Sequence, residues 1–200
     1  MSIRTLQFKL FLYMLAGSLI TGCFNQREAT RYYTLGDTQP VSQTVGNILI
    51  ALGPMEIPEY LNRQEIVIRK GETSLTMLRF DRWAEPLDVA VKRHLSDELN
   101  AQLEYAFVFP FPALTGLERE YQVSGIISAF EADEDGNIRL TVRWGIIDKN
   151  QISVIRPRKS VYTTVIERPD DIPAVAAGMT RLLDEFAADI AAGLESLELS

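Results

Sequence analysis

The sequence contains one cysteine and one histidine, and this scarcity excludes several classes of protein. Cys23 has no second cysteine to pair with, so no disulfide can hold the chain and the fold must rest on an apolar core. His94 alone excludes a metal centre built from several histidines, and we predict no metal site. The 27 acidic residues outnumber 20 basic ones, giving a formal charge of −7. This charge opposes binding to nucleic acid.

Motifs for catalysis are also missing. The twelve glycines are scattered and form no phosphate-binding loop, and no Gly-x-Ser-x-Gly sequence occurs. Four acidic residues lie at a predicted hairpin tip, where like charges are well hydrated. They are Glu131, Asp133, Glu134 and Asp135. His94 lies on the shoulder of a predicted apolar helix stripe, which favours a partly buried packing residue. We therefore predict a protein that is not an enzyme, with no catalytic residues and no cofactor.

The uncharged apolar run from Leu10 to Ile20 has eleven residues, which is too short to span a bilayer, since that needs about 20 apolar residues. It follows Arg4 and Lys9 and is typical of a secretory signal. The sequence Leu19-Ile20-Thr21-Gly22-Cys23 resembles the bacterial lipobox. That resemblance implies cleavage before Cys23 and acylation of its thiol and new amine. The alternative is an ordinary signal peptide followed by a chance cysteine. Two or more acyl chains would make a stable anchor to the membrane.

Three regions follow from this assignment. Residues 1–22 are predicted to be a lipoprotein signal peptide, residues 23–30 a lipidated tether, and residues 31–200 a single periplasmic domain. A domain of this length can bury roughly 70% of the surface that its unfolded chain exposes.

Hydrophobic periodicity predicts an α+β fold. Leucines and a valine recur every four residues between positions 87 and 103, and a second amphipathic helix is predicted for residues 172–197. Alternating or continuous apolar runs predict strands at 31–35, 47–52, 65–69, 75–80, 106–109, 121–131, 138–146, 152–155 and 160–166. Asp135-Gly136 predicts a hairpin, and Pro157 predicts a break between the last two strands. We expect a mostly antiparallel sheet with two long amphipathic helices packed on one face.

Three further segments are distinctive: Arg31 to Leu35, Gly53 to Arg69, and Asp81 to Leu87. The middle segment contains the turn Pro58 to Arg63, whose sequence Pro-Glu-Tyr-Leu-Asn-Arg leads into Ile66-Val67. A purely structural interpretation is available for each, because Tyr60 and Leu61 could cap the core and Trp83 could fix the start of a helix.

Together with the lipobox, these segments resemble the ABC-type transport auxiliary lipoproteins. The family pattern has Tyr-x-Leu after the lipid cysteine, then Pro-x-Tyr-Leu-x-Arg before an Ile-Val strand, and then Arg-Trp-Ala-Glu-Pro-Leu. The resemblance implies a periplasm-facing lipoprotein in the inner leaflet of the outer membrane, without excluding the inner membrane. It also implies a partner of the MCE-domain class, and an auxiliary or docking role in moving lipids between membranes.

We expect Tyr60, Arg63 and Trp83 to contribute to binding that partner, and we leave a homo-oligomer open. Phe24 follows the lipid cysteine where an aspartate usually signals inner-membrane retention. One alternative function is an outer-membrane assembly or activator lipoprotein, such as a cell-wall synthase activator or a pilotin. Another is a tethered ligand binder or hydrolase.

Overall fold

A computed structural model describes residues 28–36, 46–112 and 118–198 of the chain. The predicted signal peptide, Cys23, residues 24–27 of the tether and most of the predicted loop after Gly36 lie outside the described residues. The elements, in chain order, are β1 (Arg31–Tyr33), β2 (Ile48–Glu56), β3 (Glu65–Lys70), β4 (Ser74–Trp83), α2 (Leu87–Gln102), β5 (Ala106–Pro110), β6 (Tyr121–Asp133), β7 (Asn137–Asp148), β8 (Ser153–Val165) and α3 (Ile172–Glu198). Neither α2 nor α3 has the length and apolar character that would let it cross a membrane.

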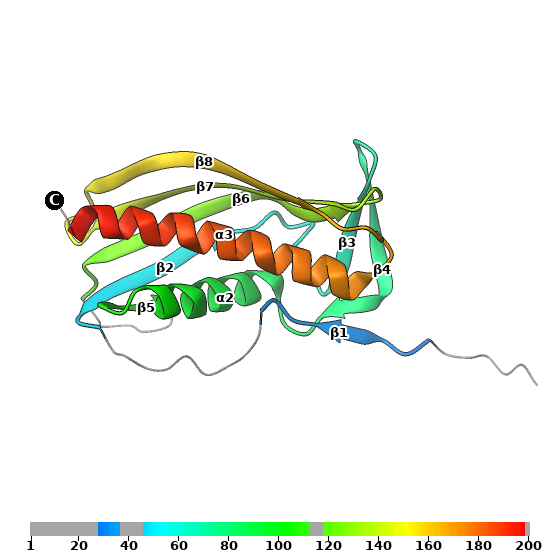
Figure 1. Ribbon diagram of the computed structural model, residues 1–200, viewed down its shortest axis with the longest axis horizontal. Coiled ribbons are helices and arrows are strands. Elements are labelled where there is room, and N and C mark those ends of the chain that lie inside the picture. The colour runs from blue at the N-terminus through cyan, green and yellow to red at the C-terminus, as the bar shows by residue number, and fades with distance from the viewer. Residues whose placement is uncertain (1–27, 37–45, 113–117, 199–200) are drawn as a thin grey trace, which may run out of the picture.

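Both described helices cover the same face of an eight-stranded sheet, as predicted (Figure 1). α3 packs along β6, β7 and β8, while α2 packs against β2 and β5. The helices also contact each other. The result is two layers, with one face of the sheet covered by helices.

The sheet is mixed, so the prediction of a mostly antiparallel sheet is wrong. Three pairings are antiparallel, namely β3–β4, β6–β7 and β7–β8. Four are parallel, namely β1–β4, β2–β5, β2–β6 and β3–β6. Turn residues reveal the antiparallel pairs because those strands are adjacent in the chain. The parallel pairs join strands that are distant in sequence, and no local signal marks them.

β6 is the strand from which the sheet divides. β7 follows one side of it over nearly its whole length. On the other side, β2 pairs with residues 121–126 and β3 pairs with residues 132 and 133. The β3–β4 hairpin therefore leaves the body of the sheet near the end of β6, and it carries β1 on its outer edge (Figure 1).

The helix stripes form the core with the facing sheet side chains. The α2 stripe is fully buried and comprises Leu87, Val91, Leu95, Leu99 and Leu103. Trp144 of β7 meets Phe186 of α3 edge to face, with ring centroids 5.7 Å apart. Asn100 also ties α2 to β5, because its side-chain amide donates to the Val108 carbonyl and accepts from the Val108 N–H, both at 2.8 Å. Both helical periodicities are thus confirmed.

β8 is continuous through Pro157, where the sequence predicted a break between two strands. The register shifts there, since Trp144 faces Arg158 whereas Ile146 faces Ile155. Among the described strands β8 pairs only with β7. A proline that lacks an N–H donor is tolerated in such an edge strand at a local bulge.

Candidate docking site at the junction of β1, β3 and β4

β1 is fastened to β4 by a buried carboxylate. The two strands pair in parallel, and residues 31–33 lie opposite residues 81–83. Asp81 is only 6% exposed. It accepts two hydrogen bonds from the Arg31 guanidinium, at 2.7 and 3.0 Å, and one from the Tyr33 hydroxyl at 2.8 Å. The Ala84 N–H donates to the Tyr33 carbonyl at 2.8 Å.

These contacts decide the charge state of Asp81. Burial alone would raise its pKa, but the hydrogen bonds from Arg31 and Tyr33 and the charge of Arg31 outweigh burial, so the pKa lies below its ordinary value. The pKa of Tyr33 is raised, first by burial and then by its bond to Asp81. The carboxylate is therefore held ionised beneath β1.

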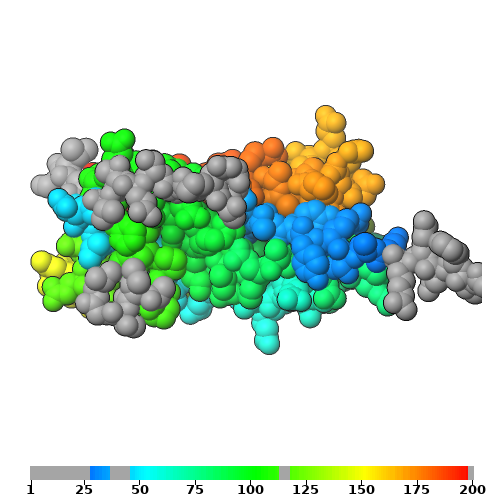
Figure 2. All heavy atoms as spheres, turned by 90° about the horizontal axis from the view of Figure 1, so that it is seen from below, coloured from blue at the N-terminus to red at the C-terminus, as the bar shows by residue number. Residues whose placement is uncertain are grey.

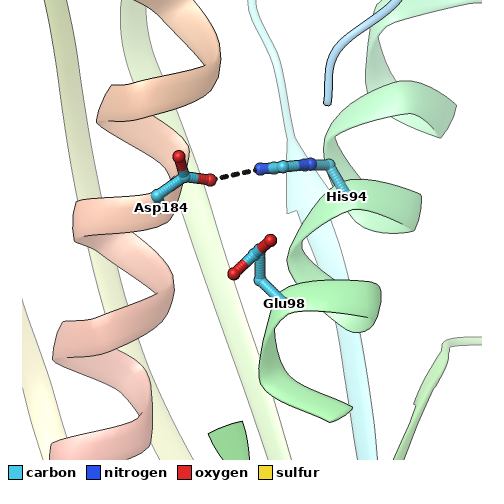
Figure 3. Close-up of side chains that lie close together, drawn as sticks. All are labelled: His94, Glu98 and Asp184. Carbon is cyan, nitrogen blue, oxygen red and sulfur yellow. Dashed lines mark hydrogen bonds and ion pairs between the residues drawn. The ribbon is translucent and has the colours of Figure 1, made fainter. Parts of the chain in front are cut away.

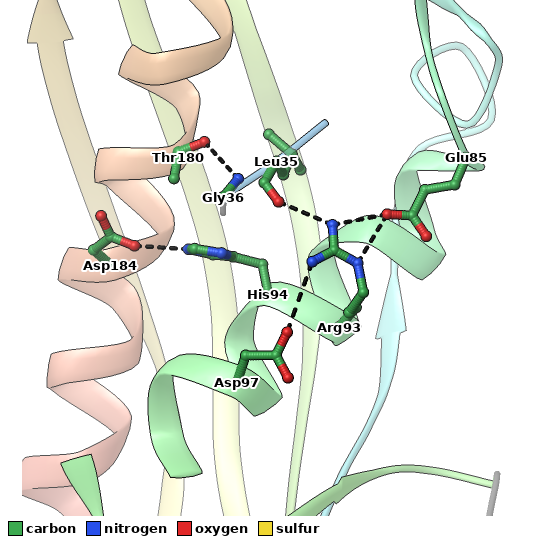
Figure 4. Close-up of polar contacts among 8 residues, drawn as sticks. All are labelled: Leu35, Gly36, Glu85, Arg93, His94, Asp97, Thr180 and Asp184. Carbon is green, nitrogen blue, oxygen red and sulfur yellow. Dashed lines mark hydrogen bonds and ion pairs between the residues drawn. The ribbon is translucent and has the colours of Figure 1, made fainter. Parts of the chain in front are cut away.

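After β1 the chain runs between the two helices, where Leu35 and Gly36 have partners on α2 and α3 (Figure 4). Leu35 is fully buried, and its carbonyl accepts a hydrogen bond of 2.9 Å from Arg93. Arg93 also holds Glu85 at 2.8 Å. The Gly36 N–H donates to the Thr180 hydroxyl of α3 at 3.1 Å. In Figure 2 the blue segment that contains β1 lies against the green surface of α2 and the orange start of α3.

Gly36 is required at this position for two reasons. Its φ of +71° is rarely adopted by residues with a side chain. A Cβ atom would also lie 2.1 Å from Nδ1 of His94. His94 is 4% exposed and its Nε2 lies 2.7 Å from Oδ1 of Asp184. The prediction of a partly buried packing residue therefore missed its polar partner on α3.

The turn from Pro58 to Arg63 closes on its own backbone and is pinned to β6. The Pro58 carbonyl accepts from the N–H groups of Leu61 and Asn62 at 2.9 and 3.1 Å. The Tyr60 hydroxyl donates to Oε2 of Glu131 at 2.9 Å. Burial and the bond to Glu131 both raise the pKa of Tyr60.

Glu131 is 4% exposed, which corrects the prediction that it belongs to a well-hydrated hairpin tip. Its Oε1 accepts a hydrogen bond of 2.7 Å from Arg69 of β3. Asp133 instead shapes the turn, by accepting from the N–H groups of Asp135 and Asn137 at 3.0 and 2.8 Å. Beside Arg69 and Glu131, an open hollow of about 690 Å³ lies between the β3–β4 hairpin and β7–β8.

A cationic surface covers the outer side of this junction. It consists of Tyr32, Arg63, Glu65, Met77 and Arg82, and we call it the arginine surface. Arg63 and Arg82 share one carboxylate, Glu65, at 3.5 and 3.6 Å. Arg63 also contacts the Met77 sulfur at 2.7 Å. Tyr32 stands opposite Arg82 and is 61% exposed. The surface thus presents two guanidinium groups beside an exposed aromatic ring and an exposed thioether.

The three predicted binding residues occupy different environments. Trp83 is 2% exposed, and its N–H donates to the Gln64 carbonyl at 2.7 Å, so it supports the turn from inside the core. Tyr60 is half-buried against Glu131. The Arg63 side chain is 35% exposed and lies on the arginine surface.

Tyr32 and Asp81 fall within two of the distinctive segments and Glu131 within the acidic group, but the sequence did not predict the contacts that they make, and no motif marked Met77. Asp81 begins the segment that runs to Leu87, and a charge next to a core tryptophan was the one available signal for its role. Glu131 carried no comparable signal, because its partners come from 62 and 71 residues away.

The family model for the ABC-type transport auxiliary lipoprotein component matches residues 33–191. The intermembrane transport lipoprotein PqiC of Escherichia coli K12 is 23% identical over 174 residues, covering 86% of this chain and 91% of that protein; PqiC of Shigella flexneri matches equally. A crystal structure of an uncharacterised protein superposes with a TM-score of 0.70 at 19% identity, covering 84% of this chain and 99% of the other. Protein XCC0632 of Xanthomonas campestris gives 0.63 at 11% identity, covering 85% and 100%.

Proposed function

Because the chain belongs to the ABC-type transport auxiliary lipoprotein family, which is not an enzyme family, we propose that it is the lipid-anchored docking component of an MCE-type intermembrane lipid transport system. In this role it sits in the periplasm on the inner leaflet of the outer membrane. It binds an MCE-domain protein and catalyses no reaction.

The observation that carries this proposal is the convergence of the three motif segments on one junction. Tyr33 and Leu35 bind the segment that follows Cys23 to the domain. Arg82 and Trp83 belong to β4, the strand with which that segment pairs. Arg31 lies eight positions after Cys23, and an extended chain over eight residue steps reaches at most about 26–29 Å. An acylated Cys23 would therefore hold the junction close to the membrane surface.

The arginine surface supplies the contact for the partner. Tyrosine and arginine side chains often dominate binding energy, because they combine a large contact area with polar or cationic groups. Arg63 and Arg82 together outnumber the single acid Glu65, which favours an acidic patch on the partner. Tyr60 and Trp83 act from beneath by fixing the turn that presents Arg63.

The test compares Arg63→Ala with a control, Arg139→Ala. Arg139 is an exposed arginine on β7 that lies outside the arginine surface. Capture of the MCE-domain partner by acylated protein is measured together with the thermal midpoint of each variant. We expect Arg63→Ala to weaken capture about tenfold or more, with a midpoint within about 2 °C of wild type. Arg139→Ala should leave both quantities unchanged. Equal capture by the two variants would refute docking through this surface.

Size measurement on the same acylated preparation gives the number of subunits. Failure of the wild-type protein to capture an MCE-domain protein, together with recovery of a cell-wall synthase or a pilus protein, would instead support the assembly or activator class.

A further inference from the structure

From three side chains that converge between α2 and α3, we propose a binding site for a zinc-class divalent cation. His94 and Glu98 lie one turn apart on α2, and Asp184 faces them from α3 (Figure 3). The metal-binding atoms of the three residues all lie within 4.8 Å of one another. Spacing of four residues places two ligands on the same face of a helix.

The charges at this point favour a cation. Asp184 has His94 as its hydrogen-bonding partner, and Glu98 has no ion-pair partner within the described ranges. The nearest arginine on α2, Arg93, is engaged by Glu85 and Asp97. Two carboxylates thus meet at a helix interface with no lysine or arginine paired to either in the described part of the chain. A divalent cation would offset both charges.

The donor set selects the class of metal. One imidazole and two carboxylates suit zinc, which binds nitrogen at about 2.0–2.1 Å and oxygen at about 2.0–2.2 Å and often leaves a fourth position to water. Magnesium and calcium prefer six or more oxygen ligands. Ligand atoms around zinc lie about 3–4 Å apart. The 2.7 Å contact between Nε2 of His94 and Oδ1 of Asp184 would therefore open slightly, and Glu98 would move inward, when a cation binds.

The imidazole is already oriented for this role. Its Nε2 points at Asp184, while the Nδ1 side of the ring is packed against the backbone of Gly36. Metal binding would move the Nε2 proton to Nδ1 or release it, leaving the Nε2 lone pair for the cation. The bound cation would join α2 to α3 at the place where the segment after β1 is held.

The experiment uses the mature chain, residues 23–200 without a histidine tag, with Cys23→Ser to remove the thiol as a competing ligand. Zinc binding is measured by titration calorimetry, and cobalt is used as a spectroscopic substitute for zinc. We expect one-to-one saturable binding and a visible cobalt spectrum typical of low coordination number. The thermal midpoint should rise by about 5–10 °C at a zinc concentration near 100 times Kd.

Glu98→Gln is the decisive variant because it leaves the His94–Asp184 hydrogen bond in place. It should keep the metal-free midpoint of the parent protein and bind zinc at least about tenfold more weakly. Glu104→Gln, the same change at an exposed position near the end of α2, is the matched control and should bind like the parent. A parent Kd weaker than about 1 mM, or equal zinc affinity for the two variants, would overturn the proposal.

Discussion

Replacing Tyr60 with phenylalanine separates the contribution of this residue to folding from any contribution to partner binding. The substitution keeps the ring and removes only the hydroxyl that lies 2.9 Å from Oε2 of Glu131. That carboxylate is almost fully buried, so water cannot readily replace the lost donor. Arg69 continues to pair with Oε1, and the Phe130 N–H, at 3.2 Å, continues to donate to Oε2.

The expected loss follows from these remaining contacts. A hydrogen bond to a charged group contributes about 1.5–3 kcal/mol. Because two other donors still serve Glu131, Tyr60→Phe should lower the free energy of unfolding by about 1.5–2 kcal/mol. In a domain of this size the thermal midpoint should fall by about 3–8 °C. Glu131→Gln should lower the free energy of unfolding by more, about 2–4 kcal/mol, because Arg69 then loses its carboxylate partner. The loss is limited because Arg69 remains partly hydrated.

Urea denaturation followed by the fluorescence of Trp83 and Trp144 measures both losses. A double-mutant cycle of Tyr60→Phe with Glu131→Gln should give a coupling energy of about 1 kcal/mol. Tyr32→Phe, which removes an exposed hydroxyl, is the control and should stay within about 0.5 kcal/mol of wild type. If Tyr60→Phe unfolds like Tyr32→Phe but captures less partner, Tyr60 is a contact residue and our structural interpretation fails.

Three further changes test the core, the clamp and the anchor. Leu95→Ala should lower the free energy of unfolding by about 2–5 kcal/mol; an unchanged urea midpoint would show that the α2 stripe does not form the core. Asp81→Asn should destabilise the protein at pH 7. The pKa of Asp81 is lower in the folded protein than in the unfolded chain, where it is about 3.9. The difference in unfolding free energy between variant and wild type should therefore disappear as pH falls from the unfolded pKa through the folded pKa. A constant difference between pH 7 and pH 3 would exclude this linkage. Cys23→Ala should abolish labelling by radioactive palmitate, and full labelling would contradict acylation at Cys23.

Sequence patterns were sufficient wherever the determining interactions are local. The leucine repeat from Leu87 to Leu103 predicted α2 and its buried face, because residues four apart share one side of a helix. Asp135-Gly136 predicted the β6–β7 hairpin, because the positive φ of 85° at Gly136 suits a tight turn. The motif segments predicted the family.

The order and direction of the strands required the tertiary structure. β6 is bordered by both β2 and β3 on one side, and no property of residues 121–133 alone selects those neighbours. The same limit explains why Pro157 suggested a broken strand. A proline is tolerated within β8 because that strand lies at the edge of the sheet, and the position of a strand at an edge is a property of the assembled sheet.

The sequence by itself determined the family, the single acylation candidate at Cys23, and the helices with their buried stripes. Only the tertiary structure decided that Glu131 is a buried partner of Tyr60 and Arg69, that Asp81 holds β1, and that His94 faces Asp184. A periodic pattern is set by backbone geometry over a few residues. The burial and pairing of a single charge depend instead on side chains brought together from 48 to 90 positions away, and these contacts exist only once the sheet and helices have packed.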